Sequence, residues 1–419
     1  AVIMLLTLSI VTLAAIQGFT GTDVDERTAS ADIGADLQVQ FVDPVSKEQA
    51  EAAVKNAIER TNNGEISKIK SSASVGTIYP TVKGNSGVVT TYVVFDNTEN
   101  TLIWDKQAVP NRNIDYTINE LSNDRFTAGE GAVSLLDLPD NDDFESDDSA
   151  FEYKITLEYP DYKFRLNETG SPEIDFVNST FRETQVTYIG KHEWIPGISS
   201  IDTNNAIIIG ENSYRKLVGT ERADAYVSNI WFFELCNQDD KDCKSALSKV
   251  AVETGNNEIV FSSRDWASSH EDVETNGGLI FGTQGLLSLQ FMISSVAVVA
   301  SAFVFLSLVL DQRSKELAIL QAIGASPNQI RKLVLFEILS IIIVSMTLGV
   351  LLGIGVAQTF NGFFFVFGFI FQIFLGNATP IDRELVWPWA EIIVVNISVL
   401  IAVVIALVLT TRKVLNANL

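Results

Sequence analysis

A short polar stretch separates two long apolar runs in the second half of the chain, and it constrains the fold more than any other feature. The apolar runs cover about 286–310 and 333–360, and the polar stretch covers 311–332. A helix needs about 20 apolar residues to cross a bilayer, and each run meets that length. Two spans with so short a connection should form a hairpin. The connection carries Arg313, Lys315, Arg331 and Lys332, so the positive-inside rule places it in the cytoplasm.

Four segments of membrane length divide the chain of 419 residues into a membrane part and one large soluble region. The predicted membrane helices are 1–19, 279–310, 333–360 and 391–411. Because successive helices reverse direction, region 20–278 should lie outside the cell and the tail 412–419 inside. The first helix has no basic region before it and no initiator Met. We interpret it as a membrane helix without its cytoplasmic lead-in, and a cleaved signal peptide is the alternative.

Region 20–278 shows alternating signals for strands and helices. Strands are predicted near 36–43, 88–95, 151–159, 206–209, 226–235 and 258–263, and helices near 210–217 and 245–253. The run Ser46-Lys-Glu-Gln49 has the form of a capping box, which predicts a further helix. Its buried face should consist of Ala50, Ala53, Val54, Ala57 and Ile58. The predicted fold class is an integral membrane protein with four helices and a large mixed α/β extracytoplasmic domain between helices one and two.

Acidic residues are concentrated in the soluble region. Of the 52 acidic residues 46 precede position 279, against 22 of the 29 basic residues, so this part has a net charge of −24 and the remainder +1. Proteins bind nucleic acids and anionic lipid surfaces through Lys and Arg. The charge balance therefore argues against a nucleic-acid partner, and solubility is the simplest reason for so acidic a surface.

Cys236 and Cys243 are the two cysteines of the chain, and both lie in the soluble region. Their spacing is unlike that of zinc ligands, and there is no third or fourth cysteine. If the region faces outward we expect a local disulfide, and two free thiols on either side of a turn are the alternative. Sequons for glycosylation begin at Asn167, Asn178 and Asn377, all in segments assigned to the outside.

The sequence contains no pattern for catalysis or for nucleotide binding. The Walker A pattern GxxxxGK[ST] is absent, so ATP and Mg²⁺ would be bound by a partner chain. His192 and His270 lie in polar stretches typical of a surface and belong to no Ser-His-Asp set. The acidic run 140–148 could supply oxygen ligands to Ca²⁺, but it lacks the glycine and the distal glutamate of an EF-hand, and a solvated loop is the simpler interpretation. We expect neither an enzyme nor a metal or cofactor site in this chain.

Small residues recur in the third predicted helix, at Gly349, Gly353 and Gly355. Small residues four apart allow helices to approach closely in lipid. Beyond position 360 the chain stays apolar through a phenylalanine-rich piece that is too short to span again. We predict that 361–390 lies at the outer interface, where its tryptophans favour the headgroup level. A longer, tilted third helix is the alternative.

The connection between the second and third helices has a pattern of its own. Apolar residues recur at helical spacing, at Leu317, Ile319, Leu320 and Ile323, and the run Gly324-Ala-Ser-Pro327 follows them. Glycine commonly ends a helix and proline is favoured in the first turn of the next one. The pattern predicts a short helix, a turn and a new helix. A turn that only reverses the chain is the alternative.

Residues 313–330 follow the pattern R-x-x-E-[IL]-A-[IL]-L-x-A-I-G-A-S-x-x-Q-I, and a helix with Glu337 comes next. This pattern resembles the hallmark of FtsX-like permeases, a family that includes MacB-type efflux proteins and lipoprotein-release permeases. The resemblance implies that the turn fits a groove on an ATPase subunit through Arg313, Glu316, Leu317, Gly324, Ala325 and Ser326. Glu337 should pair with a basic neighbour such as Arg331 or Arg313.

The start of the soluble region, Ile33-Gly-Ala-Asp-Leu-Gln-Val-Gln40, is also compatible with this family, and region 20–278 resembles the MacB-type periplasmic core domain. The resemblance implies the membrane subunit of an ABC transporter, in the cell membrane, that passes ATP-driven motion to an outer domain. Its partners would be an ABC ATPase, a second permease copy or a paralogous half, and the lipid bilayer. The alternatives are a regulatory permease that activates an outer enzyme, and a membrane-anchored binding or scaffold protein.

Overall fold

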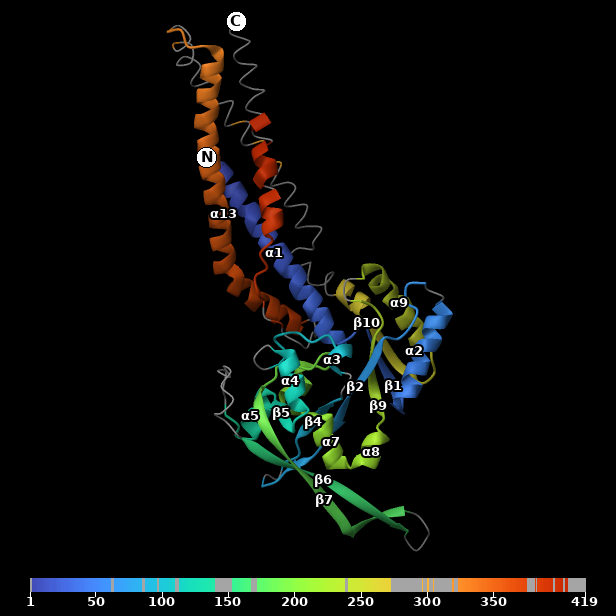
Figure 1. Cartoon of the computed structure of the whole chain (residues 1–419). Coiled ribbons are helices and arrows are strands. Elements are labelled where there is room, and N and C mark those ends of the chain that lie inside the picture. Colours follow the sequence, from blue (N-terminus) through green and yellow to red (C-terminus); the bar gives the residue numbers. More distant parts are fainter. Residues whose placement is uncertain are drawn as a thin grey trace. The chain divides into compact units, whose positions relative to one another are not determined.

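The structure is a computed structural model, and the chain forms two compact units (Figure 1). It describes residues 2–61, 64–84, 87–95, 98–109, 113–139, 153–166, 172–237, 240–272, 323–374, 381, 383–394, 396–401 and 404–405, with single residues at 296, 300, 304 and 319. The first unit contains residues 1–25, 274–371 and 382–419. The second unit contains residues 26–273 and 372–381. The predicted second membrane helix, 279–310, lies almost wholly outside the described residues.

The first unit is built from long apolar helices. Helix α1 covers Val2–Ile33 and helix α13 covers Pro327–Phe374. Within the described residues two stretches are long and apolar enough to cross a membrane, Leu5–Ile33 and Leu339–Gly362, and a shorter apolar helix lies at Trp389–Ile401. These stretches overlap the first, third and fourth predicted membrane helices.

Both long helices continue past their predicted ends. Helix α1 does not end near position 19 but runs to Ile33, where Gly34 stops it with a φ of 79°. Glycine tolerates this left-handed conformation, which is a common way to end a helix. Helix α13 does not end near 360 but runs to Phe374, and no proline interrupts it after Pro327. This observation favours the alternative of a longer third helix over a separate interfacial segment beginning at 361.

The second unit is organised around one mixed sheet of ten strands. In spatial order the strands are β10 (Val260–Asp265), β1 (Leu37–Val45), β9 (Ser228–Glu234), β2 (Ser71–Ile78), β4 (Thr90–Val94), β8 (Ala206–Gly210), β5 (Arg125–Ala128), β7 (Pro172–Lys191), β6 (Lys154–Leu166) and β3 (Thr81–Val82). The pairs β4–β8 and β5–β7 are parallel, and the other pairs are antiparallel. The predicted mixed α/β domain is confirmed.

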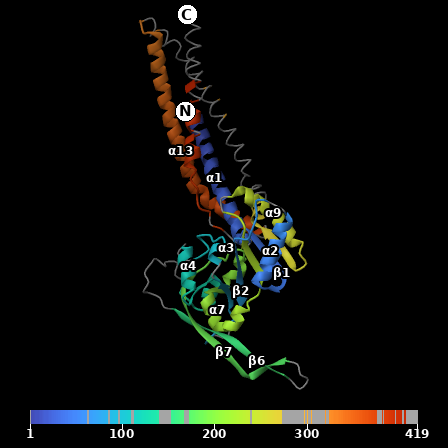
Figure 2. The same cartoon turned by 45° about the vertical axis from the view of Figure 1, so that its right-hand side comes forward.

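Two helices cover one face of the sheet at its β10–β1–β9 end. They are α2 (Lys47–Thr61) and α9 (Lys241–Gly255), which lie side by side in Figures 1 and 2. The predicted capping box is present at the start of α2, since Ser46 N donates to Gln49 Oε1 at 3.0 Å. The buried face of α2 is the predicted one: Ala50, Ala53, Val54, Ala57 and Ile58. The apolar period alone therefore located this part of the core.

Shorter helices lie around the rest of the sheet. They are α3 (Thr98–Thr101), α4 (Ile114–Leu121), α5 (Glu130–Leu135), α6 (Ser200–Asn204), α7 (Glu211–Val218) and α8 (Thr220–Asp224). Residues of α5 and α7 share a core with β4, β5 and β8, and residues of α4 share another with β4, β8 and β9. The sheet is thus covered on both faces.

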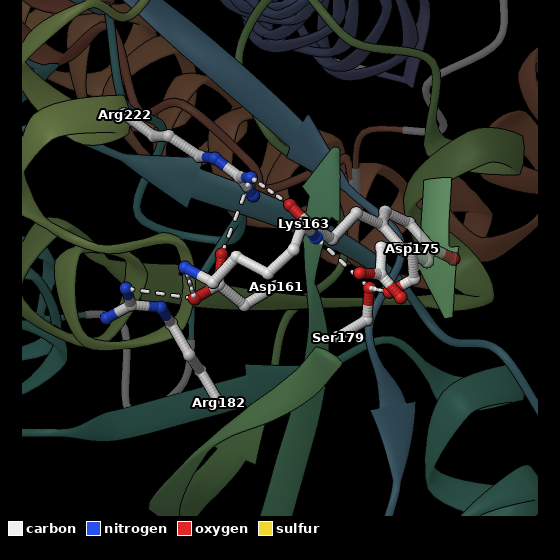
Figure 3. A network of polar contacts seen from close by, with 7 residues as sticks. Asp161, Lys163, Asp175, Ser179, Arg182 and Arg222 are labelled. Carbon is white, nitrogen blue, oxygen red and sulfur yellow. Dashed lines mark hydrogen bonds and ion pairs between the residues drawn. The ribbon is translucent and has the colours of Figure 1, made fainter. Parts of the chain in front are cut away.

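Strands β6 and β7 form a long ribbon that extends beyond the sheet (Figure 2). At its base the carboxylate of Asp161 lies within ion-pair distance of Lys163 Nζ at 3.5 Å, Arg182 Nη2 at 3.2 Å and Arg222 Nη2 at 3.5 Å (Figure 3). Arg222 belongs to α8, so this cluster ties the ribbon to the body of the unit. Next to it the pairing shifts, and Ser179 Oγ accepts a hydrogen bond from Lys163 N at 3.0 Å.

Candidate functional site

The turn before α13 is closed by hydrogen bonds of its own. Ile323 N donates to the carbonyl of Ile319 at 3.1 Å, and Gly324 follows with a φ of 103°. Ser326 and Gln329 form a capping box, with Ser326 N to Gln329 Oε1 at 3.0 Å and Gln329 N to Ser326 Oγ at 3.4 Å. Pro327 is the first residue of α13. The glycine stop and the proline start lie where the sequence predicts them.

Two apolar side chains at this turn are exposed. The exposed fraction is 59% for Ile319 and 79% for Ile323. A Cβ added at Gly324 would meet nothing within 4 Å, so the surface beside these side chains is open. We refer to residues 323–329 as the coupling turn, after the role that the sequence resemblance implies for this stretch.

The structure describes only some of the other residues predicted to contact an ATPase. Ala325 is half-buried and Ser326 is exposed. Arg313, Glu316 and Leu317 lie outside the described residues. The predicted pairing of Glu337 with Arg331 or Arg313 stays a prediction.

Helices α1 and α13 approach each other closely at two glycines. A Cβ on Gly349 would lie 2.9 Å from the carbonyl oxygen of Leu5, and a Cβ on Gly353 would lie 2.7 Å from Cβ of Thr12. Neither position has room for a side chain. Gly355 has nothing within 4 Å of its Cβ position. The contact predicted for three glycines therefore involves Gly349 and Gly353 only.

A polar cluster joins α1, α13 and the segment before the last helix. Arg383 Nη2 donates to Gln17 Oε1 at 2.5 Å, and Asn361 Nδ2 donates to the carbonyl of Arg383 at 3.0 Å. Thr20 Oγ1 accepts from Val386 N at 3.0 Å. Sequence reasoning missed this cluster. Its available signal was Arg383, a cation in a mainly apolar, aromatic stretch.

The end of α1 lies tightly against a loop of the α/β unit. A Cβ on Gly34 would lie 2.6 Å from the carbonyl carbon of Pro196 and from Gly197 N. The backbone is bonded here as well: Gly197 N donates to the Ala31 carbonyl at 2.7 Å, and Ile103 N donates to the Gly34 carbonyl at 2.8 Å. Glycine is needed at position 34 both for its positive φ and for this close approach.

Asp36 connects the same region to the disulfide. Its buried carboxylate accepts hydrogen bonds from Leu235 N at 2.8 Å and Cys236 N at 2.7 Å. Burial raises the pKa of this carboxyl group, while the hydrogen bonds from Cys236 and Leu235 oppose the shift. Cys236 and Cys243 form the predicted disulfide, with Cα atoms 5.6 Å apart. The Gly-Ala-Asp-Leu run singled out in the sequence thus begins β1 and holds the end of β9.

Two further side chains on the last turn of α1 contact the segment that starts in β10. Ser30 Oγ accepts a hydrogen bond from Trp266 Nε1 at 2.9 Å. The carboxylate of Asp32 pairs with Arg264, at side-chain exposures of 38% and 49%. We define residues 26–36, together with these partners, as the domain junction. Sequence reasoning placed this stretch in the soluble region but identified none of its polar contacts.

His192 is buried, so its predicted surface position is wrong. Its Nε2 donates to the Thr203 carbonyl at 3.1 Å, and its Nδ1 then accepts from the Thr127 hydroxyl at 3.0 Å. Burial lowers the pKa of His192 to about 4. The polar neighbours in the sequence gave no sign of this, because the burial comes from β5 and α6. His270 is half-buried and stacks on Trp266.

The remaining predicted sites are covered only in part. Asn178 lies in β7, in the stretch where its pairing with β6 shifts, whereas Asn167, Asn377 and the acidic run 140–148 lie outside the described residues. Among the residues that the structure describes, no group of three or more His, Cys, Asp or Glu side chains could hold a metal ion.

Comparison with known families assigns the C-terminal part of the chain. Residues 286–419 match the family of the FtsX-like permease C-terminal domain, and the coupling turn, α13 and both glycine contacts on it lie inside this range. The C-terminal part of the chain, residues 286–419, therefore belongs to the FtsX-like permease family. FtsX-like permeases are membrane subunits of ABC-type transporters that work with an ABC ATPase. A comparison with curated proteins gave no match.

Proposed function

We propose that this permease is the membrane subunit of a MacB-type or lipoprotein-release-type ABC transporter, in which a separate ATPase drives the movement of an extracytoplasmic domain. The observation that carries this proposal is the coupling turn. It combines the exposed side chain of Ile323 with a capping box between Ser326 and Gln329, and it lies inside the family-matched region. An exposed apolar side chain on a capped turn suits a groove on another protein.

The helices offer a route from the turn to the outer domain. Movement of the coupling turn would move α13, which starts at Pro327 and has no break before Phe374. Helix α13 would carry α1 with it, because Gly349 and Gly353 leave no space between the two backbones. ATP and Mg²⁺ would be bound by the partner. This chain would contribute the coupling turn, the helices α1 and α13, and the outer domain. Lipid, lipoprotein, peptide and drug are all compatible cargoes.

An outward position of the α/β unit is part of the proposal. The Cys236–Cys243 disulfide supports it, since disulfides persist outside the reducing cytosol. The net charge of −24 before position 279, compared with the basic stretch 311–332, supports the same orientation. The proposed topology has four membrane helices, with the N-terminal lead-in, the coupling turn and the C-terminal tail in the cytoplasm. The sequons would then be accessible to glycosylation.

Two alternatives use the same chain differently. A regulatory permease would use the same turn and the same helices, α1 and α13, to activate an outer enzyme instead of moving a cargo. A membrane-anchored binding or scaffold protein would need only one helix and no coupling turn. The exposed Ile323 and the family match favour the two permease functions over the anchor.

Photo-cross-linking tests the coupling contact directly. A photoreactive amino acid in place of Ile323 should cross-link in native membranes to a chain with a Walker A motif, identified by mass spectrometry. The same amino acid in place of Val252, which is 68% exposed on α9, provides the control and should capture no such chain. If position 323 captures no ATPase, or position 252 captures it equally, the proposed contact is wrong.

Cysteine labelling tests the topology. Cysteines placed singly at positions 326 and 380 should react with an impermeant thiol reagent from opposite sides of the membrane. Both native cysteines are in the disulfide, so the introduced thiols supply the signal. Labelling of both positions from the outside would refute the four-helix arrangement.

A further inference from the structure

Arg27 and Asp105 form an enclosed ion pair at the domain junction. Arg27 lies on α1, and Asp105 lies in the loop after α3. Arg27 Nε donates to Asp105 Oδ2 at 2.5 Å and Arg27 Nη2 donates to Asp105 Oδ1 at 3.0 Å, so the contact is bidentate. The side chains are only 15% and 12% exposed. Asp105 is itself held in place, because its Oδ1 also accepts from Gln107 N at 2.7 Å.

This geometry fixes an orientation as well as a distance. Two parallel hydrogen bonds between a planar guanidinium and a carboxylate form only when the two planes are aligned. Both side chains are largely withdrawn from water, so separating the pair has a higher cost than separating an exposed pair. A helix that carries Arg27 can therefore neither rotate about its axis nor slide against the α/β unit without breaking the pair.

The neighbouring ion pair at the same junction is different. Asp32 and Arg264 are 38% and 49% exposed, so water can replace their mutual contact. Exposed pairs contribute little to stability and hold no fixed geometry on their own. The two pairs lie on the same end of α1 and both connect it to the α/β unit, which makes the exposed pair a matched control for the enclosed one.

Position along α1 gives the enclosed pair its significance. The helix contacts α13 through Leu5 and Thr12, at the two tight glycines, and the same helix carries Arg27. The first unit ends on α1 at Asp25 and the second unit begins at Glu26, so Arg27 lies just inside the second unit. Arg27 is therefore the first long cationic side chain of α1 that belongs to the α/β unit.

We propose that Arg27 and Asp105 are the positioning pair through which movement of α1 enters the extracytoplasmic domain. This inference rests on the proposed function, since it assigns the point at which force from the membrane helices reaches the domain. Neither residue touches a cargo or the ATPase. Their role is to keep the end of α1 and the domain moving together, so that motion is not lost as rotation or bending at the junction.

Pulsed electron paramagnetic resonance can test this on the full chain in complex with its ATPase in lipid nanodiscs. Spin labels are attached at Phe19→Cys on α1 and Val252→Cys on α9, which are 43% and 68% exposed. The disulfide leaves no free native thiol to label. The readouts are the width of the distance distribution, and the change in that distribution between the nucleotide-free and the ATP-bound complex.

Four variants separate positioning from general damage. Arg27→Ala removes the ion pair. Arg27→Lys keeps the positive charge but cannot form the two parallel hydrogen bonds. The double variant Arg27→Glu with Asp105→Arg exchanges the two charges. Arg264→Ala removes the exposed pair. We expect the distribution to become about twice as wide in Arg27→Ala and less so in Arg27→Lys, because the bidentate restraint is lost. The reversed pair should restore part of the narrow distribution, and Arg264→Ala should leave it unchanged.

The ATP-dependent change separates the two proposals. If it occurs in the wild type and is lost in Arg27→Ala, the positioning role is supported. If Arg27→Ala keeps the narrow distribution and the full ATP-dependent change, the positioning role is overturned. A third outcome is that Arg27→Ala widens the distance distribution but the wild type shows no ATP-dependent change. The proposed transport function then fails. The pair only stabilises the structure in that case, which also overturns the positioning role. If Arg27→Ala does not fold, the same two readouts are compared between the wild type and Arg27→Lys.

Discussion

Two glycines with left-handed backbone mark the two ends of the proposed route, and their surroundings are opposite. Gly34 has a φ of 79° at the domain junction, and Gly324 has a φ of 103° in the coupling turn. An added Cβ would lie 2.6 Å from backbone atoms at Gly34, but would meet nothing within 4 Å at Gly324. One glycine is enclosed by its own chain, and the other lies on an open surface.

The difference separates a contact that the chain makes with itself from one that, under the proposed function, a partner ATPase completes. At the junction, polar groups are paired inside the structure, as Asp36 shows with its two backbone hydrogen bonds. At the turn, Ser326 and Gln329 cap the start of α13, whereas the apolar side chain of Ile323 remains exposed. Changes at the junction should therefore alter stability, and replacement of the exposed Ile323 should alter function with little effect on stability.

The largest stability effect is expected for Gly34→Ala. The new methyl group must displace backbone at Pro196 and Gly197, and alanine also resists the positive φ, so the free energy of unfolding should fall by about 3–4 kcal/mol. Chemical denaturation in detergent provides the measurement. Gly84→Ala is the matched control, because Gly84 has a φ of 88° in open space. It should lose only about 1–2 kcal/mol. Equal losses of unfolding free energy in the two variants would show that the close approach at Gly34 does not contribute to stability.

Acid should weaken the loop that encloses Gly34. His192 starts this loop, and burial lowers its pKa from 6.5 to about 4. The folded state therefore favours neutral imidazole. The resulting stability is complete above the unfolded pKa of about 6.5 and is lost as the pH falls towards 4. The loss should total about 3 kcal/mol.

The variant His192→Gln isolates this contribution, because its amide can replace both hydrogen bonds but does not titrate. Unfolding free energies of the wild type and the variant are compared at pH 7 and pH 4.5, so that effects of the carboxylates cancel. The wild type should show the steeper loss. Parallel pH dependence in the two proteins would mean that His192 is not kept neutral by the fold.

The disulfide should also contribute to the junction, through Asp36. Replacement of Cys236 and Cys243 by serine together should cost about 2–3 kcal/mol, because a short closed loop is released in the unfolded chain. Alkylation of the native protein without reductant should modify neither cysteine. Two alkylated cysteines in folded protein would mean a reduced pair, and would weaken the proposed outward position of the domain.

The glycines of α13 give the smallest expected effect on stability. Gly353→Ala should destabilise the α1–α13 contact by about 1–3 kcal/mol, since Cβ of Thr12 already occupies the space. Gly355→Ala, in open space on the same helix, should be neutral or slightly stabilising. Unfolding of the protein from mixed micelles provides the measurement. The close contact would be refuted by equal tolerance of alanine at both positions.

Local patterns predicted the elements whose signals lie within one segment. The apolar period of α2 and the buried Ala206–Ile209 run of β8 are examples. Strand β7 was not predicted, because four successive side chains, Thr180–Glu183, are all exposed and give no alternating pattern. The polar part of α1, from Thr20 to Ile33, was missed for a related reason. Its helical state is supported by partners such as Trp266 and Asp105, which are distant in the sequence.

The candidate site was predicted to a similar degree. The turn at Gly324 and the tight glycines Gly349 and Gly353 follow from residue types with strong local rules. The junction does not, because Gly34, Asp36 and His192 acquire their roles only from segments that the fold brings to them. Sequence reasoning thus located the turn and the tight glycines better than the long-range contacts within the α/β unit.

The central claim is that the coupling turn passes the work of a partner ATPase to this chain. It is tested most directly by the ATP hydrolysis of the reconstituted complex in lipid nanodiscs, together with its ATP-dependent conformational change. Gly324→Leu fills the open surface and should leave the complex folded while abolishing the conformational change that accompanies hydrolysis. Glu316→Arg should act in the same way. Gly355→Leu, also in open space but within the helix, should keep hydrolysis and conformational change coupled. Full coupling in both Gly324→Leu and Glu316→Arg would contradict the claim and leave the turn as a simple reversal of the chain.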